Sequence, residues 1–189
     1  MEPIYANLIT ALWTLWLLYW LIAGRDVKAT QRHESPGSRA THIVPLIIGA
    51  LLLWRPTLPG GFLCGKILPP SLALYLVGVV IFVAGLAFTV WARVHLGRNW
   101  SASPAMKEGH ELVTTGPYAF VRHPIYSGII LATLGTGLTG SVFGIVLFVI
   151  VTTMFLFRVG TEERYMMELF PGTYPAYRAR TKRLVPLIW

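Results

Sequence analysis

Long stretches without charged residues alternate along the chain with short polar segments. Three of these stretches are long enough to be considered as membrane spans: residues 3–24, 67–92 and 124–157. A helix that crosses the hydrocarbon core of a bilayer needs about 20 mostly apolar residues. The first two stretches, of 22 and 26 residues, therefore each predict one spanning helix. A fourth stretch, 40–54, holds only 15 residues and predicts either a short tilted helix or a re-entrant one.

The third stretch, residues 124–157, is too long for one ordinary span and short for two. Its middle reads Gly135-Thr-Gly-Leu-Thr-Gly140, with three glycines in six positions. Glycine readily adopts the backbone angles that a tight turn requires. We therefore predict a helical hairpin with two short arms that turns within residues 135–140.

The composition also indicates a membrane protein. The chain has 189 residues, of which 54% are hydrophobic and only 13% charged, and its mean hydropathy is +0.60. Soluble domains usually carry about 25% charged residues. A soluble globular domain, a disordered chain and a disulfide-rich scaffold are all but excluded. Cys64 is the single cysteine, which excludes an internal disulfide and a cysteine-based metal cluster, and no metal site is expected.

The net charge of +8 is typical of nucleic-acid-binding proteins but also of membrane proteins with a basic cytoplasmic side. With five spanning helices and the N-terminus outside, 14 of the 16 lysines and arginines fall on the cytoplasmic side, and only Arg55 and Lys66 fall outside. This asymmetry favours the membrane explanation. We expect a multi-pass protein of a prokaryotic inner membrane with a cytoplasmic C-terminus, embedded in the lipid bilayer and without a nucleic-acid partner.

The polar residues gather in two predicted cytoplasmic segments, 93–123 and 158–189, which flank the hairpin. The chain therefore divides into an N-terminal part, residues 1–92, with about three spanning helices, and a second part, residues 93–189, that includes the hairpin. We expect a site built from both polar segments at the cytoplasmic mouth of the last two helices.

A turn precedes the predicted start of the hairpin. Gly116-Pro117 is a turn signal, His123 is held away from helical angles by the proline that follows, and Pro124 suits the first turn of a helix. The free N–H groups and positive dipole end of such a helix attract a carboxylate or phosphate. Aromatic faces that can stack on a purine or hold a cation come from Tyr118, Phe120 and Tyr126. These tyrosines equally suit an interfacial belt, and His123 an ordinary loop position.

After the hairpin, Arg158 and Glu162 are four residues apart and share a face if the helix continues out of the membrane. An arginine at the bilayer boundary can bind a substrate carboxylate through two hydrogen bonds. Glu162 can accept hydrogen bonds from ribose hydroxyls or an amino group. The plainer alternatives are that Arg158 snorkels to the interface and that the two form a surface pair worth roughly a few tenths of a kcal/mol.

Several motifs resemble, in order, the isoprenylcysteine carboxyl methyltransferase family. They are Gly109-His-Glu-Leu-Val, Thr115-Gly-Pro-Tyr, Val121-Arg-His-Pro-Ile-Tyr-Ser-Gly, Arg158 with Glu162-Glu163, the aromatic positions Phe170, Tyr174 and Tyr177, and Leu184-Val-Pro-Leu-Ile. Phospholipid N-methyltransferases are similar over the same region. The resemblance covers roughly residues 93–189, and the N-terminal half matches only as hydrophobic spans.

The resemblance implies an all-α integral membrane enzyme that binds S-adenosylmethionine at its cytoplasmic side and releases S-adenosylhomocysteine. The family's cofactor contacts correspond here to His110, Glu111, Leu112, Val113, Tyr118, His123, Pro124, Ile125, Tyr126 and Glu162. The arginine that is proposed to orient the substrate carboxylate corresponds to Arg158, so that Arg158 and Glu162 form the expected catalytic pair. Where eukaryotic members use a glutamine for the cofactor, this chain has Ser103.

We therefore expect methyl transfer to a lipophilic or lipidated substrate in the membrane, with a carboxylate of the isoprenylcysteine type as the acceptor. A carboxylate needs no general base, so positioning and electrostatics would carry the catalysis. A thiol, a phenol or an amine as acceptor stays open, and an amine would need a base, for which Glu162 or His123 is the candidate. The oligomeric state also stays open.

Two alternatives come from other classes of protein. Membrane reductases of the sterol-reductase-like type, which use NADPH, also carry an Arg-His-Pro-x-Tyr pattern near a last hairpin. They usually place an acidic residue after the glycine that follows, whereas Gly128 is followed here by Ile129. A non-enzymatic membrane scaffold or transporter subunit is the second alternative. The predicted spans carry no interior charge, which transport sites usually need.

Overall fold

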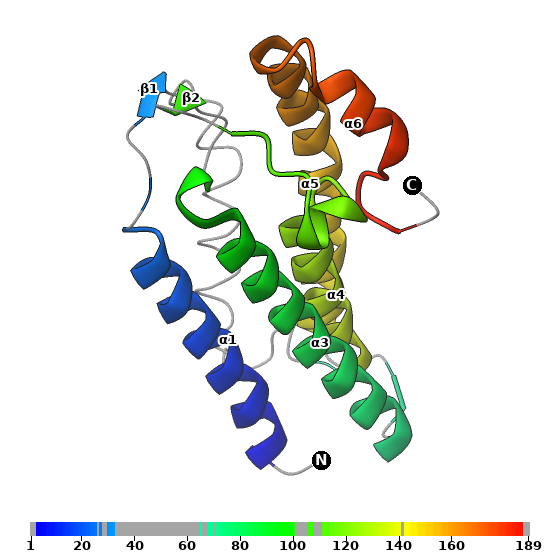
Figure 1. The fold of residues 1–189 in the computed structure, drawn as a ribbon. Coiled ribbons are helices and arrows are strands. Elements are labelled where there is room, and N and C mark those ends of the chain that lie inside the picture. The colour runs from blue at the N-terminus through cyan, green and yellow to red at the C-terminus, as the bar shows by residue number, and fades with distance from the viewer. Residues whose placement is uncertain are drawn as a thin grey trace.

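The fold is built mainly from helices. The computed structural model describes residues 3–25, 27, 30–32, 65, 68–69, 71–100, 106–107, 111–140 and 142–186. The α-helices of this part are α1 (Pro3–Ala23), α3 (Leu72–Leu96), α4 (Pro124–Leu138), α5 (Val142–Leu169) and α6 (Tyr174–Arg180) (Figure 1). Two 3₁₀ turns, η2 (Gly97–Asn99) and η3 (Gly116–Ala119), follow α3 and precede α4. The expected helical architecture is thus confirmed for the described residues.

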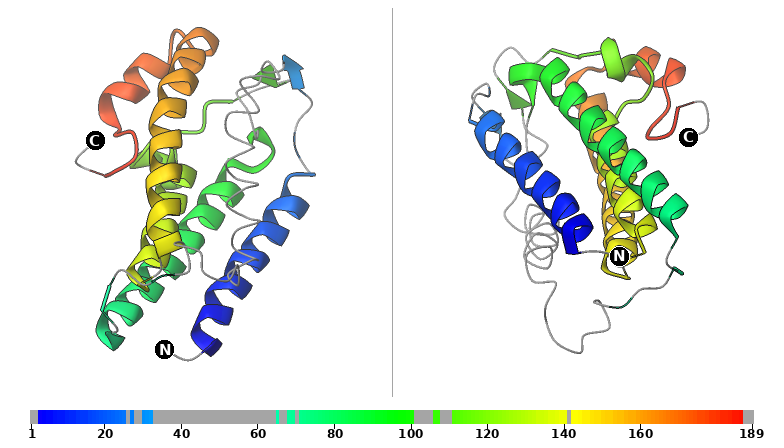
Figure 2. Two further views of the ribbon diagram at one scale, coloured as in Figure 1. Left: turned by 180° about the vertical axis from the view of Figure 1, so that it is seen from behind. Right: turned by 90° about the horizontal axis from the view of Figure 1, so that it is seen from below.

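The two short strands β1 (Thr30–Arg32) and β2 (Met106–Lys107) pair antiparallel at one end of the molecule. α1, α3 and α5 run toward this end and α4 runs away from it, so the four long helices form one bundle (Figures 1 and 2). The N-terminus lies at the opposite end, whereas η3, α6 and the end of α5 lie toward the β1–β2 end. Most polar elements therefore lie at one end of the bundle.

Two helices are long and apolar enough to cross a membrane: Leu72–Asn99, which includes η2, and Val142–Leu169. Two shorter apolar helices, Asn7–Ala23 and Pro124–Leu138, accompany them. These four helices correspond to the predicted stretches 3–24, 67–92 and both arms of the hairpin. The fifth predicted segment, residues 40–54, lies outside the described residues, so the expected count of five spans stays a prediction.

The hairpin is present, but its second arm is longer than predicted. α4 ends at Leu138 and α5 begins at Val142, and the turn between them contains Gly140 with φ 94°. α5 does not stop where the apolar stretch ends at Phe157 but continues for 28 residues in all. Glutamate, arginine, methionine and leucine, which are good helix formers, make up most of residues 162–169, and Pro171-Gly172 follows the end of the helix. The prediction of two short arms is therefore wrong for the second arm.

The glycines of α3 and α4 bring these two helices into close contact. A Cβ atom on Gly85 would lie 2.5 Å from the backbone N of Ala132 and 2.6 Å from the carbonyl O of Gly128. Gly78 meets Gly135 in the same way, since its Cβ would lie 2.8 Å from the Gly135 carbonyl. Small residues are the usual means by which membrane helices approach closely. Gly135, predicted to lie in the turn, is thus a packing position within α4.

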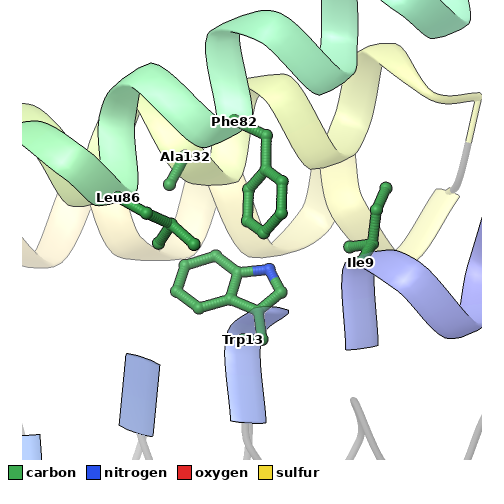
Figure 3. Close-up of a cluster of buried hydrophobic side chains, with 5 residues drawn as sticks. All are labelled: Ile9, Trp13, Phe82, Leu86 and Ala132. Carbon is green, nitrogen blue, oxygen red and sulfur yellow. The ribbon is translucent and has the colours of Figure 1, made fainter. Parts of the chain in front are cut away.

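α1 joins the bundle through two tryptophans. Trp13 packs in a buried cluster with its α1 neighbour Ile9, with Phe82 and Leu86 of α3, and with Ala132 of α4 (Figure 3). Its indole Nε1 donates a hydrogen bond to Thr136 Oγ1 on α4 at 3.2 Å. The Nε1 of Trp16 donates to Thr89 Oγ1 on α3 at 2.6 Å. Hydrogen bonds of this kind help to hold apolar helices together where burial from water does not contribute.

Candidate functional site

The start of α4 is held by the C-terminal segment. Val121 and Lys182 form a parallel β-bridge, and the N–H groups of Arg122 and His123 donate to the carbonyls of Lys182 and Arg183 at 2.8 and 3.1 Å. One turn into α4, Ser127 Oγ donates to the carbonyl O of Leu184 at 2.5 Å. The two polar segments that flank the hairpin in sequence therefore meet, as predicted.

α4 begins where the sequence predicts. His123, its N-cap residue, has φ −124° and ψ 59°, outside the helical region that the following proline disfavours, and Pro124 occupies the first turn. No side chain of the described residues caps this turn. The first N–H groups of a helix have no partner within the helix. Those of Ile125 and Tyr126 are thus suited to hold an anion.

Arg158 and Glu162 form a close pair on α5, and Tyr126 of α4 joins them. Arg158 Nε donates to Glu162 Oε1 at 2.7 Å and to the hydroxyl O of Tyr126 at 2.7 Å. The Tyr126 hydroxyl in turn donates to Glu162 Oε1 at 2.5 Å. The side chains of Arg158 and Glu162 are 10% and 20% exposed, so both charges are largely withdrawn from solvent. The prediction that Arg158 and Glu162 share one face of the helix is confirmed. The alternative that they form an exposed surface pair does not agree with their burial.

The ring of Tyr126 is stacked on both sides. His123 lies parallel to one face with 5.5 Å between ring centroids and 5° between planes, and Phe155 lies against the other at 4.1 Å and 10°. Phe155 is buried in an apolar cluster between α4 and α5 with Ile129, Leu147 and Val151. Tyr126 is therefore fixed through its ring as well as its hydroxyl.

His123 lies between two neighbouring carboxylates. Its Nδ1 is 3.5 Å from Glu162 Oε2, and its Nε2 is 3.7 Å from Glu163 Oε1. Burial by itself would lower the pKa of His123, but the two carboxylates outweigh it and raise the pKa above its usual range. His123 thus favours the cationic form and links Glu162 to Glu163.

Glu163 is the centre of a second ionic cluster, at the junction of α5, the start of α4 and the C-terminal segment. Arg122 reaches it through Nε and Nη2, both 2.8 Å from Oε1, and Arg183 Nε lies 3.3 Å from Oε2. Arg178 Nε stands further away at 3.6 Å. Arg122 Nη1 also donates to the carbonyl O of Thr181. Arg122 therefore connects the start of α4 to α5 and to the C-terminal segment.

The remaining predicted cofactor contacts are only partly brought to this cluster. Tyr118 is buried in η3, where its hydroxyl faces the carbonyl O of Ala92 at 3.5 Å and its ring stacks on His95. Burial, together with Tyr177 and Glu162, raises the pKa of Tyr118 well above its usual range. Glu111 is exposed in the extended segment before η3, and Leu112 and Val113 are half-buried there. His110 and Ser103 lie outside the described residues.

Two residues of the site were missed by sequence reasoning. Phe155 is one apolar residue among many in the hairpin, and nothing in its local pattern marks it. Glu163 is visible as the neighbour of Glu162 in a quoted motif, but the sequence does not show that it takes different partners. In the described part of the chain, no group of histidine, cysteine or acidic side chains could hold a metal ion.

The chemistry of these groups suits a ligand that carries both a positive and a negative end. The Glu162 carboxylate and the aromatic rings around it favour a cation such as a sulfonium. The uncapped first turn of α4 favours a carboxylate. Glu162 Oε2 is 3.5 Å from its neighbour His123 Nδ1, which leaves acceptor capacity on a carboxylate oxygen for a hydroxyl or amino donor. The residues present thus fit S-adenosylmethionine.

Comparison with known proteins gives matches mainly to methyltransferases. The model of the isoprenylcysteine carboxyl methyltransferase (ICMT) family matches residues 76–168. A protein-S-isoprenylcysteine O-methyltransferase of Schizosaccharomyces pombe is 40% identical over 101 residues, which are 51% of this chain and 43% of the relative. Methanethiol S-methyltransferase 1 of Bradyrhizobium diazoefficiens is 32% identical over 174 residues, 83% of this chain and 57% of that protein.

The fold is shared with a solved structure as well. The structure of the eukaryotic intramembrane Ras methyltransferase ICMT matches with a TM-score of 0.53 and 19% sequence identity, over 84% of this chain and 55% of that one. At this level of identity the match shows a common fold. The chain spans about half the length of the curated relatives that it matches.

Proposed function

Because this chain belongs to the isoprenylcysteine carboxyl methyltransferase family over residues 76–168, we propose that it transfers a methyl group from S-adenosylmethionine to a lipophilic acceptor in the membrane. The observation that supports this most directly is the buried pair of Arg158 and Glu162, joined at 2.7 Å beside the start of α4. The two buried charges of this pair therefore lie beside a segment that carries one of the family motifs.

The cofactor would be held by residues before α4 and on α5. The proposed contacts are His110, Glu111, Leu112, Val113, Tyr118, His123, Pro124, Ile125, Tyr126 and Glu162. Glu162 would accept hydrogen bonds, and the first N–H groups of α4 would receive the carboxylate end. When bound, S-adenosylmethionine supplies a methyl group on a cationic sulfur, which the nearby Glu162 carboxylate favours electrostatically.

Arg158 would orient the acceptor. A guanidinium is planar and can form two parallel hydrogen bonds to a carboxylate, which fixes the direction of the attacking oxygen. A carboxylate is already a nucleophile at neutral pH, so the site would need positioning and no general base. A carboxylate of isoprenylcysteine type is therefore the first acceptor we propose.

A thiol is the second candidate for the acceptor. The methanethiol S-methyltransferase covers 83% of this chain, more than the 51% covered by the S. pombe isoprenylcysteine enzyme. A thiol needs to lose its proton before it attacks, and the Glu162 carboxylate is the neighbouring acceptor for that proton. The two candidates are separated by offering the purified protein a farnesylated cysteine and methanethiol side by side.

The site would face the cytoplasm. The cations of the described polar elements lie at the β1–β2 end of the bundle, in agreement with a cytoplasmic face there and an external N-terminus. We propose residence in a prokaryotic inner membrane, with residues 1–92 anchoring the chain in the bilayer and residues 93–189 carrying the transfer chemistry. A lipidated acceptor would then reach Arg158 from the bilayer.

Substitution of the pair tests this function. Arg158→Ala and Glu162→Ala should each lower methyl transfer from labelled S-adenosylmethionine by about a hundredfold or more, because each removes a positioned charge from a water-poor site. Arg164→Ala and Glu168→Ala are the matched controls, since both are exposed on the same helix. Thermal unfolding of every variant in detergent confirms that it is folded.

Full activity in Arg158→Ala and Glu162→Ala would remove the site assignment. Calorimetric titration of the parent protein with S-adenosylhomocysteine and NADPH distinguishes the proposed enzyme from a reductase. Tight NADPH binding without S-adenosylhomocysteine binding would favour the reductase, and binding of neither would favour a non-enzymatic scaffold.

A further inference from the structure

The hydroxyl of Tyr126 lies between the two charged residues of the site. It donates to Glu162 Oε1 at 2.5 Å and accepts from Arg158 Nε at 2.7 Å, while Arg158 Nε also reaches the same carboxylate oxygen at 2.7 Å. The three groups close a triangle in which each touches the other two. A phenolic hydroxyl has one proton to donate and lone pairs to accept. Its proton is directed here to Glu162 and its lone pair to Arg158.

The ring of Tyr126 is packed on both of its faces. Its ring stacks at 4.1 Å on Phe155, which is 4% exposed, and at 5.5 Å on His123. His123 is itself anchored, since its backbone N–H donates to the carbonyl O of Arg183. The hydroxyl therefore belongs to a residue with packed ring faces, whereas Arg158 has a long side chain with many rotamers.

The Tyr126 hydroxyl beside Arg158 Nε constrains the orientation of the rest of the guanidinium. The guanidinium is planar, so the single Nε–H, shared between the Tyr126 hydroxyl and Glu162 Oε1, constrains the plane in which Nη1 and Nη2 lie. Those are the nitrogens that a bidentate contact with an acceptor carboxylate requires. An error of about 1 Å in such a contact can reduce transfer a hundredfold.

We propose that Tyr126 is a positioning residue, whose hydroxyl fixes Arg158 and Glu162 relative to each other during methyl transfer. This inference rests on the proposed function and deepens it. The family resemblance assigns Tyr126 to the cofactor, and its backbone N–H at the start of α4 is free to serve that role. The hydroxyl instead acts through the two charged residues.

The chain contains a matched control. Tyr165 lies on α5, three residues beyond Glu162, and its buried hydroxyl has no hydrogen-bond partner in the described part of the structure. Tyr126→Phe and Tyr165→Phe remove the same oxygen atom from the same kind of side chain. They differ in whether that oxygen joins the Arg158–Glu162 pair.

The test is a double-mutant cycle with Tyr126→Phe, Glu162→Gln and the double variant, with Tyr165→Phe beside them. Tyr126→Phe should lower kcat/KM for the acceptor by about tenfold or more, as expected for the loss of hydrogen bonds to charged groups. The Kd for S-adenosylhomocysteine should stay within about twofold, because the ring and the backbone of Tyr126 are unchanged. Tyr165→Phe should leave both values unchanged.

If Tyr126 acts through the pair, the double variant loses no more than Glu162→Gln alone. Additive losses in kcat/KM, or a weakened S-adenosylhomocysteine Kd that accounts for the whole effect, would overturn the inference. Absence of transfer by the parent protein would refute the proposed function instead. The same cycle is then measured by thermal unfolding, where non-additive shifts support the triangle and additive shifts overturn it.

Discussion

Glu162 and Glu163 are neighbours in the sequence but belong to different clusters. Consecutive positions on a helix point about 100° apart. Glu162 therefore faces Arg158 and Tyr126, while Glu163 faces Arg122 and the C-terminal segment. His123 lies between the two carboxylates and approaches both. Glu162 thus belongs to the proposed chemistry, whereas Glu163 connects three segments of the chain.

The protonation of His123 should make the stability of the protein depend on pH. Glu162 and Glu163, together with the stacked Tyr126 and the adjacent Arg122, surround this imidazole, and the carboxylates raise its pKa in the folded state. In the unfolded state its pKa is about 6.5. A group whose pKa is raised by folding stabilises the protein fully when the pH is below its unfolded pKa. This stabilisation disappears as the pH rises through the folded pKa. We therefore expect the contribution of His123 to stability to be lost as the pH rises above about 6.5.

The comparison that checks this is the melting temperature of the parent protein and His123→Gln in detergent, measured from about pH 6 to pH 9. The advantage of the parent protein should shrink as the pH rises, because glutamine does not titrate. His95→Gln is the control, since the His95 ring is bonded to Thr115 and has no carboxylate beside it among the described contacts. A difference in melting temperature that stays constant or grows with pH would contradict the expected linkage.

At the scale of elements, the site depends on how closely α4 lies against α3. His123 precedes α4 as its N-cap residue, Tyr126 lies in its first turn, and Gly128 meets Gly85 of α3. The hairpin then brings α5 back against the other side of α4, where Phe155 contacts Tyr126. The start of α4 is thus placed by packing along its whole length as well as by its C-terminal neighbour.

Gly85→Val should separate these helices. Its Cβ would lie 2.5 Å from the backbone N of Ala132, and backbone atoms cannot rotate away as a side chain could. We expect a loss of about 1–3 kcal/mol, the usual effect of overpacking, seen as a lower melting temperature. The activity of the folded protein should fall with it, because the start of α4 moves.

Gly160→Ala is the matched control for the helix contact. Nothing lies within 4 Å of a Cβ atom at this position, which is exposed on α5. Alanine favours a helix over glycine by about 1 kcal/mol, so the melting temperature should hold or rise. Equal losses in Gly85→Val and Gly160→Ala would mean that the close contact between α3 and α4 does not limit stability.

At the scale of the whole molecule, the bundle is polarised from end to end. The start of α4, the end of α5 and α6 lie toward the end that also holds β1 and β2, and the N-terminus lies at the other (Figures 1 and 2). The apolar helices between the two ends expose many large side chains, such as Leu21, Val80 and Phe157. This distribution suits a protein whose sides face lipid and whose two ends face water.

The predicted orientation can be checked with reporter fusions in a bacterial host. Green fluorescent protein at the C-terminus should fluoresce, and alkaline phosphatase there should be inactive, because the C-terminus is expected in the cytoplasm. A periplasmic tag at the N-terminus should be open to protease in spheroplasts. Active phosphatase at the C-terminus would contradict the cytoplasmic site and would require an even number of spans with the N-terminus outside.

Several features of this protein follow from the sequence alone, because they depend on residues close together in the chain. The apolar stretches located α1, α3 and the hairpin, and Pro124 located the start of α4. The spacing of four residues put Arg158 and Glu162 on one face, because the helical repeat is the same in every helix. The quoted motifs also indicated the family. The segment 40–54 and His110 stay predictions.

Only the tertiary structure decided which partners these residues have. Glu163 is bound by Arg122 and Arg183, 41 and 20 residues away, and the stack of Phe155 on Tyr126 joins two different helices. Gly135 reads as a turn residue in sequence but packs against α3 within α4. Such contacts depend on the positions of whole helices, and short stretches of sequence carry no signal for them. The local chemistry could therefore be predicted, and its arrangement in space could not.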